Sequence, residues 1–195
     1  MIRKQALRLL LATALAMPTG ALAVEHYLID TPKMHAFITF KVQHLGFSWL
    51  LGRFNRFSGS FDYDPDNPAN NRVEVVIDTA SLDTNHAERD KHLRDERFFH
   101  VEKYPEARFI STRWEDLGNG RARLAGNLTL HGMTKEVVID VNQVGAGKDP
   151  WGGFRRGFEG RTTLHLSDWN FAKAAMLGPA AENIELYLSI EGIRQ

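Results

Sequence analysis

Hydrophobic and polar positions alternate with a period of two along most of the chain, which is typical of half-buried β-strands. The clearest run extends from His35 to His44, where Ala36 and the next three alternate positions are apolar and His44 ends the series. Similar runs follow at residues 57–63, 73–79, 107–112, 124–130, 137–141, 158–166 and 184–190. We therefore predict about eight or nine strands.

Short segments rich in turn-forming residues separate these runs. Residues 64–71 read DPDNPANN, and Gly118-Asn119-Gly120 has the composition of a tight hairpin. The Gly-rich segment 145–157 is expected to be the loosest part of the chain. Because short turns and not helices connect the strands, the pattern favours an all-β fold, a single closed antiparallel β-barrel, over alternating βαβ units.

Only one segment has the character of a helix. Asn85 and Glu88 have the spacing of a capping box, and no Gly or Pro interrupts residues 86–99. We predict a short helix at about 86–100, which ends before Pro105. Such a polar helix needs a neighbour to be stable, so it should cover one end of the barrel. The pattern leaves open whether it is a fixed plug or a lid.

The predicted inner faces mix phenylalanines with small residues such as Ala36, Gly59 and Gly126. Small residues in a barrel of about eight strands either receive a neighbouring large side chain or leave a void. From the residues alone, a solid core and an internal cavity remain equal alternatives. The twelve phenylalanines and four tryptophans supply apolar surface suited to a hydrocarbon chain, although most belong in an ordinary core.

The first 23 residues have the pattern of a secretory signal peptide. Basic residues precede a short apolar run, and Ala21 and Ala23 fit cleavage before Val24. We therefore expect a signal peptide at 1–23, one barrel domain at 24–195 and a periplasmic location. The chain has no cysteine, which excludes disulfides and thiol chemistry. No basic block suggests nucleic acid, and no later apolar run suggests stable membrane insertion.

Histidines are the main candidates for polar chemistry. His86 with Asp90, and His92 with Glu96, have helical i,i+4 spacing, but no third ligand is placed by the sequence, so we expect no metal. His44 is the only ionisable group on its strand face. It is either an ordinary histidine at the barrel end or a hydrogen-bond donor to a ligand head group. No hydrolase motif occurs, so we expect no catalytic residues.

Four separated blocks of sequence resemble the YceI-like family of periplasmic polyisoprenoid-binding proteins. In chain order they are KVQHLGFSWLLGRFNRFSGSFDYD, SLDTNHAERDKHLR, GNLTLHGMTKEVVIDV and DPWGG. The resemblance covers almost all of the chain after residue 24. It implies a lipocalin-like antiparallel barrel whose apolar cavity holds an isoprenoid or similar long-chain lipid, and it favours the cavity over the solid core.

The resemblance and the strand faces together give the functional prediction. We expect a binding or carrier protein for an isoprenoid lipid, either a quinone or a polyprenyl chain, with no cofactor and with a homodimer as an open option. An enzyme acting on such a lipid, or a cavity-free structural or stress protein, are the alternatives. The predicted ligand contacts are Ile38, Phe40, Val42, His44, Phe47, Trp49, Phe61, Leu93, Phe98 and Phe109.

Overall fold

The computed structural model describes residues 24–32, 35–169, 171, 178 and 181–195. The predicted signal peptide, residues 1–23, lies outside the described residues. The strands are β1 (Glu25–Ile29), β2 (Phe37–His44), β3 (Ser48–Phe54), β4 (Phe57–Tyr63), β5 (Arg72–Asp78), β6 (Leu82–Asp83), β7 (Glu106–Gly118), β8 (Arg121–Leu130), β9 (Met133–Lys148), β10 (Phe154–His165) and β11 (Asn183–Arg194). The helix is α1 (Ala87–Arg94), and short 3-10 turns occur at Pro68–Asn70, Thr79–Ser81 and Leu166–Trp169.

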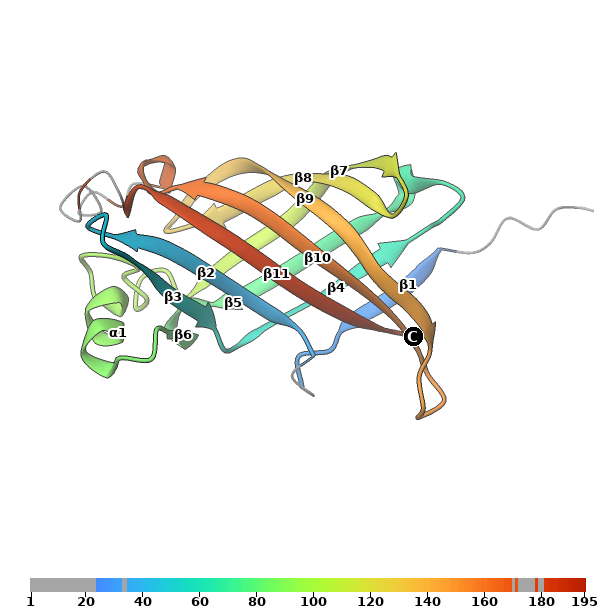
Figure 1. Ribbon diagram of the computed structural model, residues 1–195, viewed down its shortest axis with the longest axis horizontal. Helices are drawn as coiled ribbons and strands as arrows, with labels where there is room; N and C mark the ends of the chain where they lie inside the picture. Colours follow the sequence, from blue (N-terminus) through green and yellow to red (C-terminus); the bar gives the residue numbers. More distant parts are fainter. Residues whose placement is uncertain (1–23, 33–34, 170, 172–177, 179–180) are drawn as a thin grey trace, which may run out of the picture.

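Eight strands form a closed ring. They pair in the order β1-β4-β5-β7-β8-β9-β10-β11, and β1 also pairs with β11, which closes the barrel. All neighbours are antiparallel, and α1 lies at one end of the barrel (Figure 1). The predicted all-β barrel with one short helix is therefore confirmed.

Strands β2, β3 and β6 extend the sheet beyond this ring at the α1 end. β11 pairs with β1 through residues 192–194 and with β2 through residues 184–189, so β1 and β2 lie end to end along it. The strands on the other side of β1 and β2 are divided likewise, because β4 pairs with β1 and β3 pairs with β2. β3 continues to β6 through only two residue pairs. The barrel is therefore a regular ring at one end and is widened by the β2–β3 hairpin at the other.

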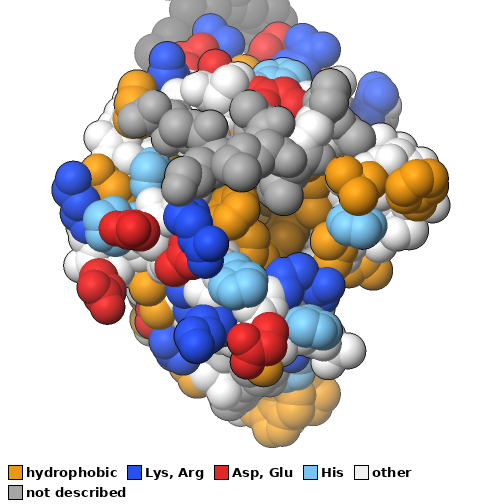
Figure 2. Space-filling view, turned by 90° about the vertical axis from the view of Figure 1, so that its left-hand side faces the viewer, with side chains coloured by type: hydrophobic (Ala, Val, Ile, Leu, Met, Phe, Trp, Pro, Cys, Tyr) orange, Lys and Arg blue, Asp and Glu red, His pale blue; other side chains and the backbone are white. Residues whose placement is uncertain are grey.

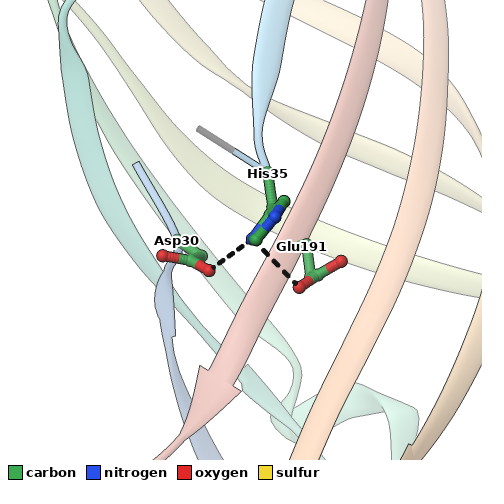
Figure 3. Close-up of side chains that lie close together, drawn as sticks. All are labelled: Asp30, His35 and Glu191. Carbon is green, nitrogen blue, oxygen red and sulfur yellow. Dashed lines mark hydrogen bonds and ion pairs between the residues drawn. The ribbon is translucent and has the colours of Figure 1, made fainter. Parts of the chain in front are cut away.

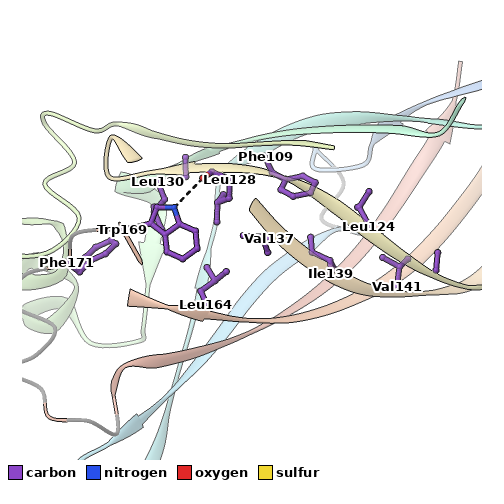
Figure 4. Packing of buried hydrophobic residues seen from close by; sticks show 12 residues of the cluster. Phe109, Leu124, Leu128, Leu130, Val137, Ile139, Val141, Leu164, Trp169 and Phe171 are labelled. Atoms are coloured by element: carbon purple, nitrogen blue, oxygen red, sulfur yellow. Dashed lines mark hydrogen bonds between the residues drawn. The ribbon is translucent and has the colours of Figure 1, made fainter. Parts of the chain in front are cut away.

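The interior of the ring is packed with the alternate apolar side chains that the pattern predicted (Figure 4). Several glycines there receive aromatic rings from neighbouring strands. A Cβ atom at Gly126 would lie 2.4 Å from the ring of Phe109, and one at Gly52 would lie 2.2 Å from the ring of Phe40. Because these rings occupy the space over the glycines, the small residues make room for phenylalanine side chains. They do not themselves create an internal cavity.

A buried arginine closes the end of the barrel opposite α1. Arg156 is 9% exposed and donates hydrogen bonds to the Tyr27 hydroxyl and to the Gln143 side chain at 3.1 Å. It pairs with Glu25 at 3.1 Å, and its guanidinium lies 3.9 Å from the centre of the Tyr63 ring. Although burial opposes the effect, hydrogen bonds from Tyr27 and the arginines hold the pKa of Glu25 below its ordinary value. This end is therefore filled by a charged network.

The helix is shorter than predicted. It ends at Arg94 because Asp95 adopts an extended conformation, so Pro105 does not determine its end. Its N-cap is His86, whose side chain accepts a hydrogen bond from the Arg89 backbone N–H. Asn85, the predicted cap, instead has a φ of 60°. The capping-box spacing therefore located the helix but placed its start one residue too early.

The segment 145–157 is also more regular than predicted. β9 continues to Lys148 and β10 begins at Phe154, so only a short loop separates them. Asp149 accepts backbone hydrogen bonds from Trp151 and Gly153 and thereby fixes this loop. Within the described residues, no helix is both long and apolar enough to cross a membrane.

Candidate binding cavity

An apolar cavity of about 470 Å³ occupies the α1 end of the barrel. Figure 2 views this end and shows hydrophobic side chains within a central hollow, with histidine and charged side chains below it and beside it. A second, narrower space of about 130 Å³ lies further inside the ring. The two spaces share Ile38, Ile77, Leu128, Leu164 and Leu186 in their walls. The barrel is therefore hollow along part of its length, and the solid-core alternative does not describe it.

The solvent exposure of the inward-facing residues of β2 rises toward this end of the barrel. Ile38 is buried, Phe40 and Val42 are half-buried, and His44 is exposed, although all four line the larger cavity. An inward-facing apolar side chain remains partly accessible only where the interior itself is accessible. The cavity thus opens at the end that carries His44 and α1.

Most of the predicted contact residues lie in the cavity walls. Ile38, Phe40, Val42, His44, Leu93 and Phe98 line the larger space, while Phe61 and Phe109 line the narrower one. Whether they contact a ligand stays a prediction. Phe47 and Trp49 line neither space and are 86% and 51% exposed. The turn after His44 sets Val42 opposite Leu50, so Leu50 faces the cavity and Trp49 faces away from it.

Polar groups in the cavity wall gather near its opening. Arg89 and His92 of α1, together with Thr84, join His44 there. Arg89 donates from Nε to the Thr84 hydroxyl at 2.7 Å and from Nη2 to the Thr84 carbonyl at 2.6 Å. No ion pair to Arg89 occurs among the described residues. The sequence did not single out Arg89, although it lies one helical turn before Leu93 and therefore on the same face.

Hydrogen bonds to a buried carboxylate hold α1 over the opening. Asp90 is 6% exposed, and its Oδ1 accepts from the Thr84 backbone N–H at 2.9 Å and from the Thr84 hydroxyl at 2.5 Å. Arg94 also donates to the Leu82 carbonyl. The helix is consequently docked through polar contacts to β6 and the residue that follows it, while its Leu93 lines the cavity.

An aromatic cluster with a histidine borders the same end. The His131 ring stacks on Phe171 at 4.9 Å between centroids and contacts Tyr104 edge-on at 4.5 Å. Its Nδ1 lies 3.3 Å from the Trp169 carbonyl, and its Nε2 is buried without a hydrogen-bond partner among the described residues. Burial lowers the pKa of His131. Since Phe171 lines the cavity, the His131 ring packs directly behind the cavity wall.

A second cluster of ionisable groups lies outside the cavity, at the break between β1 and β2. Asp30, His35 and Glu191 lie close enough to share a cation (Figure 3). However, Arg155 Nη1 is 2.6 Å from Asp30 and 2.5 Å from Glu191, and it uses the same two oxygens that face His35. Because a guanidinium already binds both of these oxygens, we assign the cluster to a salt-bridge network that joins β1 to β10 and β11.

The closed antiparallel ring and the internal apolar cavity define a lipocalin-like β-barrel. A family model described as the YceI-like domain matches residues 27–192, so this chain belongs to the YceI-like family. A UPF0312 protein from Photorhabdus laumondii is 50% identical over 195 residues and covers 100% of both chains. A UPF0312 protein from Ectopseudomonas mendocina is 52% identical over 180 residues, which is 92% of this chain and 93% of the relative.

Solved structures show the same fold. A YceI protein from Campylobacter jejuni has a TM-score of 0.70 at 29% identity, covering 79% of this chain and 90% of that one. BcnA from Burkholderia cenocepacia has a TM-score of 0.75 at 20% identity, covering 84% and 98%. A polyisoprenoid-binding domain from Saccharophagus degradans has a TM-score of 0.62 at 17% identity, covering 87% and 98%.

Proposed function

We propose that this protein binds a long-chain isoprenoid lipid, a quinone or a polyprenyl chain, and carries or buffers it in the periplasm without covalent chemistry. The observation that carries this proposal is the open apolar cavity of about 470 Å³, with a narrower continuation in the ring. Its volume lies in the range of about 300–1,000 Å³ that ligand sites occupy. The same fold in a polyisoprenoid-binding domain supports the choice of lipid.

The distribution of polar groups suggests how such a lipid lies. The chain occupies the apolar interior, and the head group lies at the opening beside His44, Arg89 and His92. These side chains can donate hydrogen bonds to a quinone carbonyl or a phosphate. Each buried methylene contributes about 0.8 kcal/mol before ordering costs, whereas one hydrogen bond contributes about 1 kcal/mol net. Affinity should therefore depend mainly on the chain.

The direct test is to extract the purified protein with organic solvent and to identify the recovered lipid by mass spectrometry. Titration with prenyl lipids of increasing length should then show affinity that rises with length and levels off when the cavity is full. Affinity that follows the head group and ignores chain length would contradict the proposal. Incubation of the protein with the recovered lipid tests the enzymatic alternative, since chemical conversion would exclude a simple carrier.

The variant Phe40→Asp should abolish lipid retention. Phe40 lines the cavity, so a carboxylate there must stay charged beside hydrocarbon or take up a proton, at a cost of several kcal/mol. Phe37→Asp is the matched control, because Phe37 is 37% exposed on the same strand and lines neither cavity space. Equal loss of retention in both variants would show that the cavity is not the site. His44→Ala should weaken head-group selectivity and leave chain binding largely intact.

The location is tested separately. Cleavage before Val24 predicts that protein recovered from the periplasm has lost residues 1–23. Intact-mass measurement decides this, and a species that retains these residues would contradict a freely diffusing carrier.

A further inference from the structure

The hairpin that joins β2 and β3 carries an exposed apolar surface. Phe47 is 86% exposed, Leu51 66%, Leu45 56% and Trp49 51%. A strand pair with one face toward the interior normally presents polar side chains on its other face. Here the inward residues Val42 and Leu50 line the cavity, while Trp49 and Leu51 make the outward face apolar as well. We call residues 45–51 the apolar tip.

The apolar tip adjoins the cavity opening. His44 and Leu45 line the cavity, and the tip continues from them without a break in the chain. The turn itself has Leu45 at a φ of 51° and Gly46 at 80°, and it is closed by a 2.9 Å bond from the Phe47 N–H to the His44 carbonyl. Asparagine is the residue commonly found where Leu45 stands, because a branched apolar side chain is strained at positive φ. Leu45 nevertheless places an apolar side chain, 56% exposed, at this strained position, and so adds to the exposed apolar surface of the tip.

The composition of the tip fits a lipid bilayer. The Lys41 ammonium lies 4.3 Å from the centre of the Trp49 ring, and both side chains project from the outer face. Tryptophan is enriched where a protein meets the membrane interface. The Lys41 ammonium is already paired with Glu185 at 2.9 Å, so the apolar side chains of the tip, and not this charge, carry its fit to a bilayer. A narrow hairpin end with Leu45 and Phe47 at its apex can enter the interface without burying polar strand edges deeply.

We propose that the apolar tip docks on a phospholipid bilayer and thereby sets the cavity opening against the membrane surface. This inference rests on the proposed function in one respect, since a bilayer is where a long isoprenoid chain is stored. Docking brings His44 and α1 close to the interface, so that a lipid chain can pass between bilayer and cavity with little exposure to water.

The test compares two exposed aromatic residues at opposite ends of the barrel. Purified wild-type protein, Phe47→Ser and Trp151→Ser are sedimented with vesicles of phosphatidylethanolamine and phosphatidylglycerol. Trp151 is 70% exposed in the β9–β10 loop, away from the opening (Figure 1). We expect wild type and Trp151→Ser to sediment with the vesicles, and Phe47→Ser to bind roughly tenfold more weakly, the scale of burying one large apolar side chain. Phe47→Leu should retain most of the binding.

Three results would overturn the proposal. They are wild-type protein that does not bind vesicles, equal binding by all variants, and equal loss in Phe47→Ser and Trp151→Ser. Analytical ultracentrifugation of the same samples tests the alternative that the tip binds a second copy of the chain. Self-association that is abolished in Phe47→Ser, while vesicle binding is unchanged, would assign the tip to that second copy.

Ligand uptake separates this proposal from the proposed function. A prenyl lipid offered in solution should bind Phe47→Ser as well as wild type, whereas transfer of the same lipid from vesicles should slow in Phe47→Ser alone. If vesicle binding depends on Phe47 but no prenyl lipid binds in solution, the docking surface stands and the proposed ligand is wrong.

Discussion

Pairs of phenylalanine and glycine shape the inside of the barrel at the level of single residues. The rings of Phe40 and Phe109 lie across neighbouring strands over Gly52 and Gly126. The far end of each ring occupies the space that a side chain at the glycine would take. The sequence showed that small and large residues alternate on these faces, but it did not show which glycine receives which ring, because that depends on the stagger between strands.

The variant Gly126→Ala should destabilise the protein. Its Cβ would lie 2.4 Å from the Phe109 ring and 2.7 Å from the Ile110 carbonyl oxygen, so the backbone itself must shift. Overpacking of this kind costs about 1–3 kcal/mol. Gly145→Ala is the matched control, because a Cβ at Gly145 meets no atom within 4 Å. Urea unfolding should show a lower midpoint for Gly126→Ala alone; equal midpoints would contradict the close packing.

His131 should make the free energy of unfolding fall as pH drops below the ordinary histidine pKa of about 6.5. Burial lowers its pKa in the folded protein below the ordinary value of about 6.5, so the unfolded chain binds more protons between the two pKa values. The stabilisation is complete above the unfolded pKa and is lost as pH falls toward the folded one. The variant His131→Asn, which tolerates the φ of 50°, should flatten this dependence.

Denaturant unfolding at several pH values measures this effect. The exposed His165, which is bonded to Asn183, provides the control variant His165→Asn. If the change of unfolding free energy with pH is altered equally in His131→Asn and His165→Asn, the buried His131 ring is not the origin of the pH dependence.

At the level of elements, α1 shows which features of a helix can be predicted from sequence. Its polarity and the absence of Gly and Pro correctly located one helix among strands. Its mode of docking was not predicted, because Asp90 looks like a surface residue until Thr84 and β6 are folded against it. For the same reason the basic side chains at the opening, Arg89 and His92, could not be assigned to a cavity wall.

The variant Asp90→Ala should loosen α1 while the barrel remains folded. It removes the acceptor for the Thr84 backbone N–H and hydroxyl, which leaves buried donors unpaired at a local cost of about 1–3 kcal/mol. Amide exchange from Ala87 to Arg94 should accelerate, with little change in the ring strands. Lys91→Ala, which alters an exposed side chain of the same helix, should leave the exchange unchanged.

Exchange measurements with lipid distinguish a lid from a plug. A lid should exchange faster than the strands in the free protein and slow down when the prenyl lipid binds. Exchange that does not respond to lipid would identify α1 as a structural plug.

At the level of the whole molecule, strand alternation was sufficient to predict a closed antiparallel barrel. The predicted inward positions on β8, β9, β10 and β11 do face the interior. The sequence did not predict that Arg156 closes one end, because an arginine beside Arg155 in a Gly-rich segment gives no sign of burial. Its partners Glu25 and Tyr63 come from strands distant in sequence, so only the completed ring brings them together.

The variant Arg156→Met should lower the stability of the whole barrel. Its removal takes one donor from the Tyr27 hydroxyl, the Gln143 side chain and Glu25, while Tyr27 and Arg194 still donate to Glu25, so the loss of these buried hydrogen bonds should cost about 1–3 kcal/mol. Arg161→Met is the control on the same strand, since Arg161 also stacks on a tyrosine but its side chain is 64% exposed. Calorimetry should show a fall in Tm for the first variant only, whereas lipid affinity, measured below that Tm, should be retained.

The pairing of the first strand with the last has a consequence for the order of folding. Arg194 bonds to Glu25 across 169 residues of sequence, and β11 is the shared partner of β1, β2 and β10. A chain still lacking its last 12-residue strand therefore cannot close, and it presents unpaired edges open to association with other chains. Contacts so distant in sequence form slowly. The barrel can consequently close only after β11 has been synthesised, and truncation within β11 should yield insoluble protein.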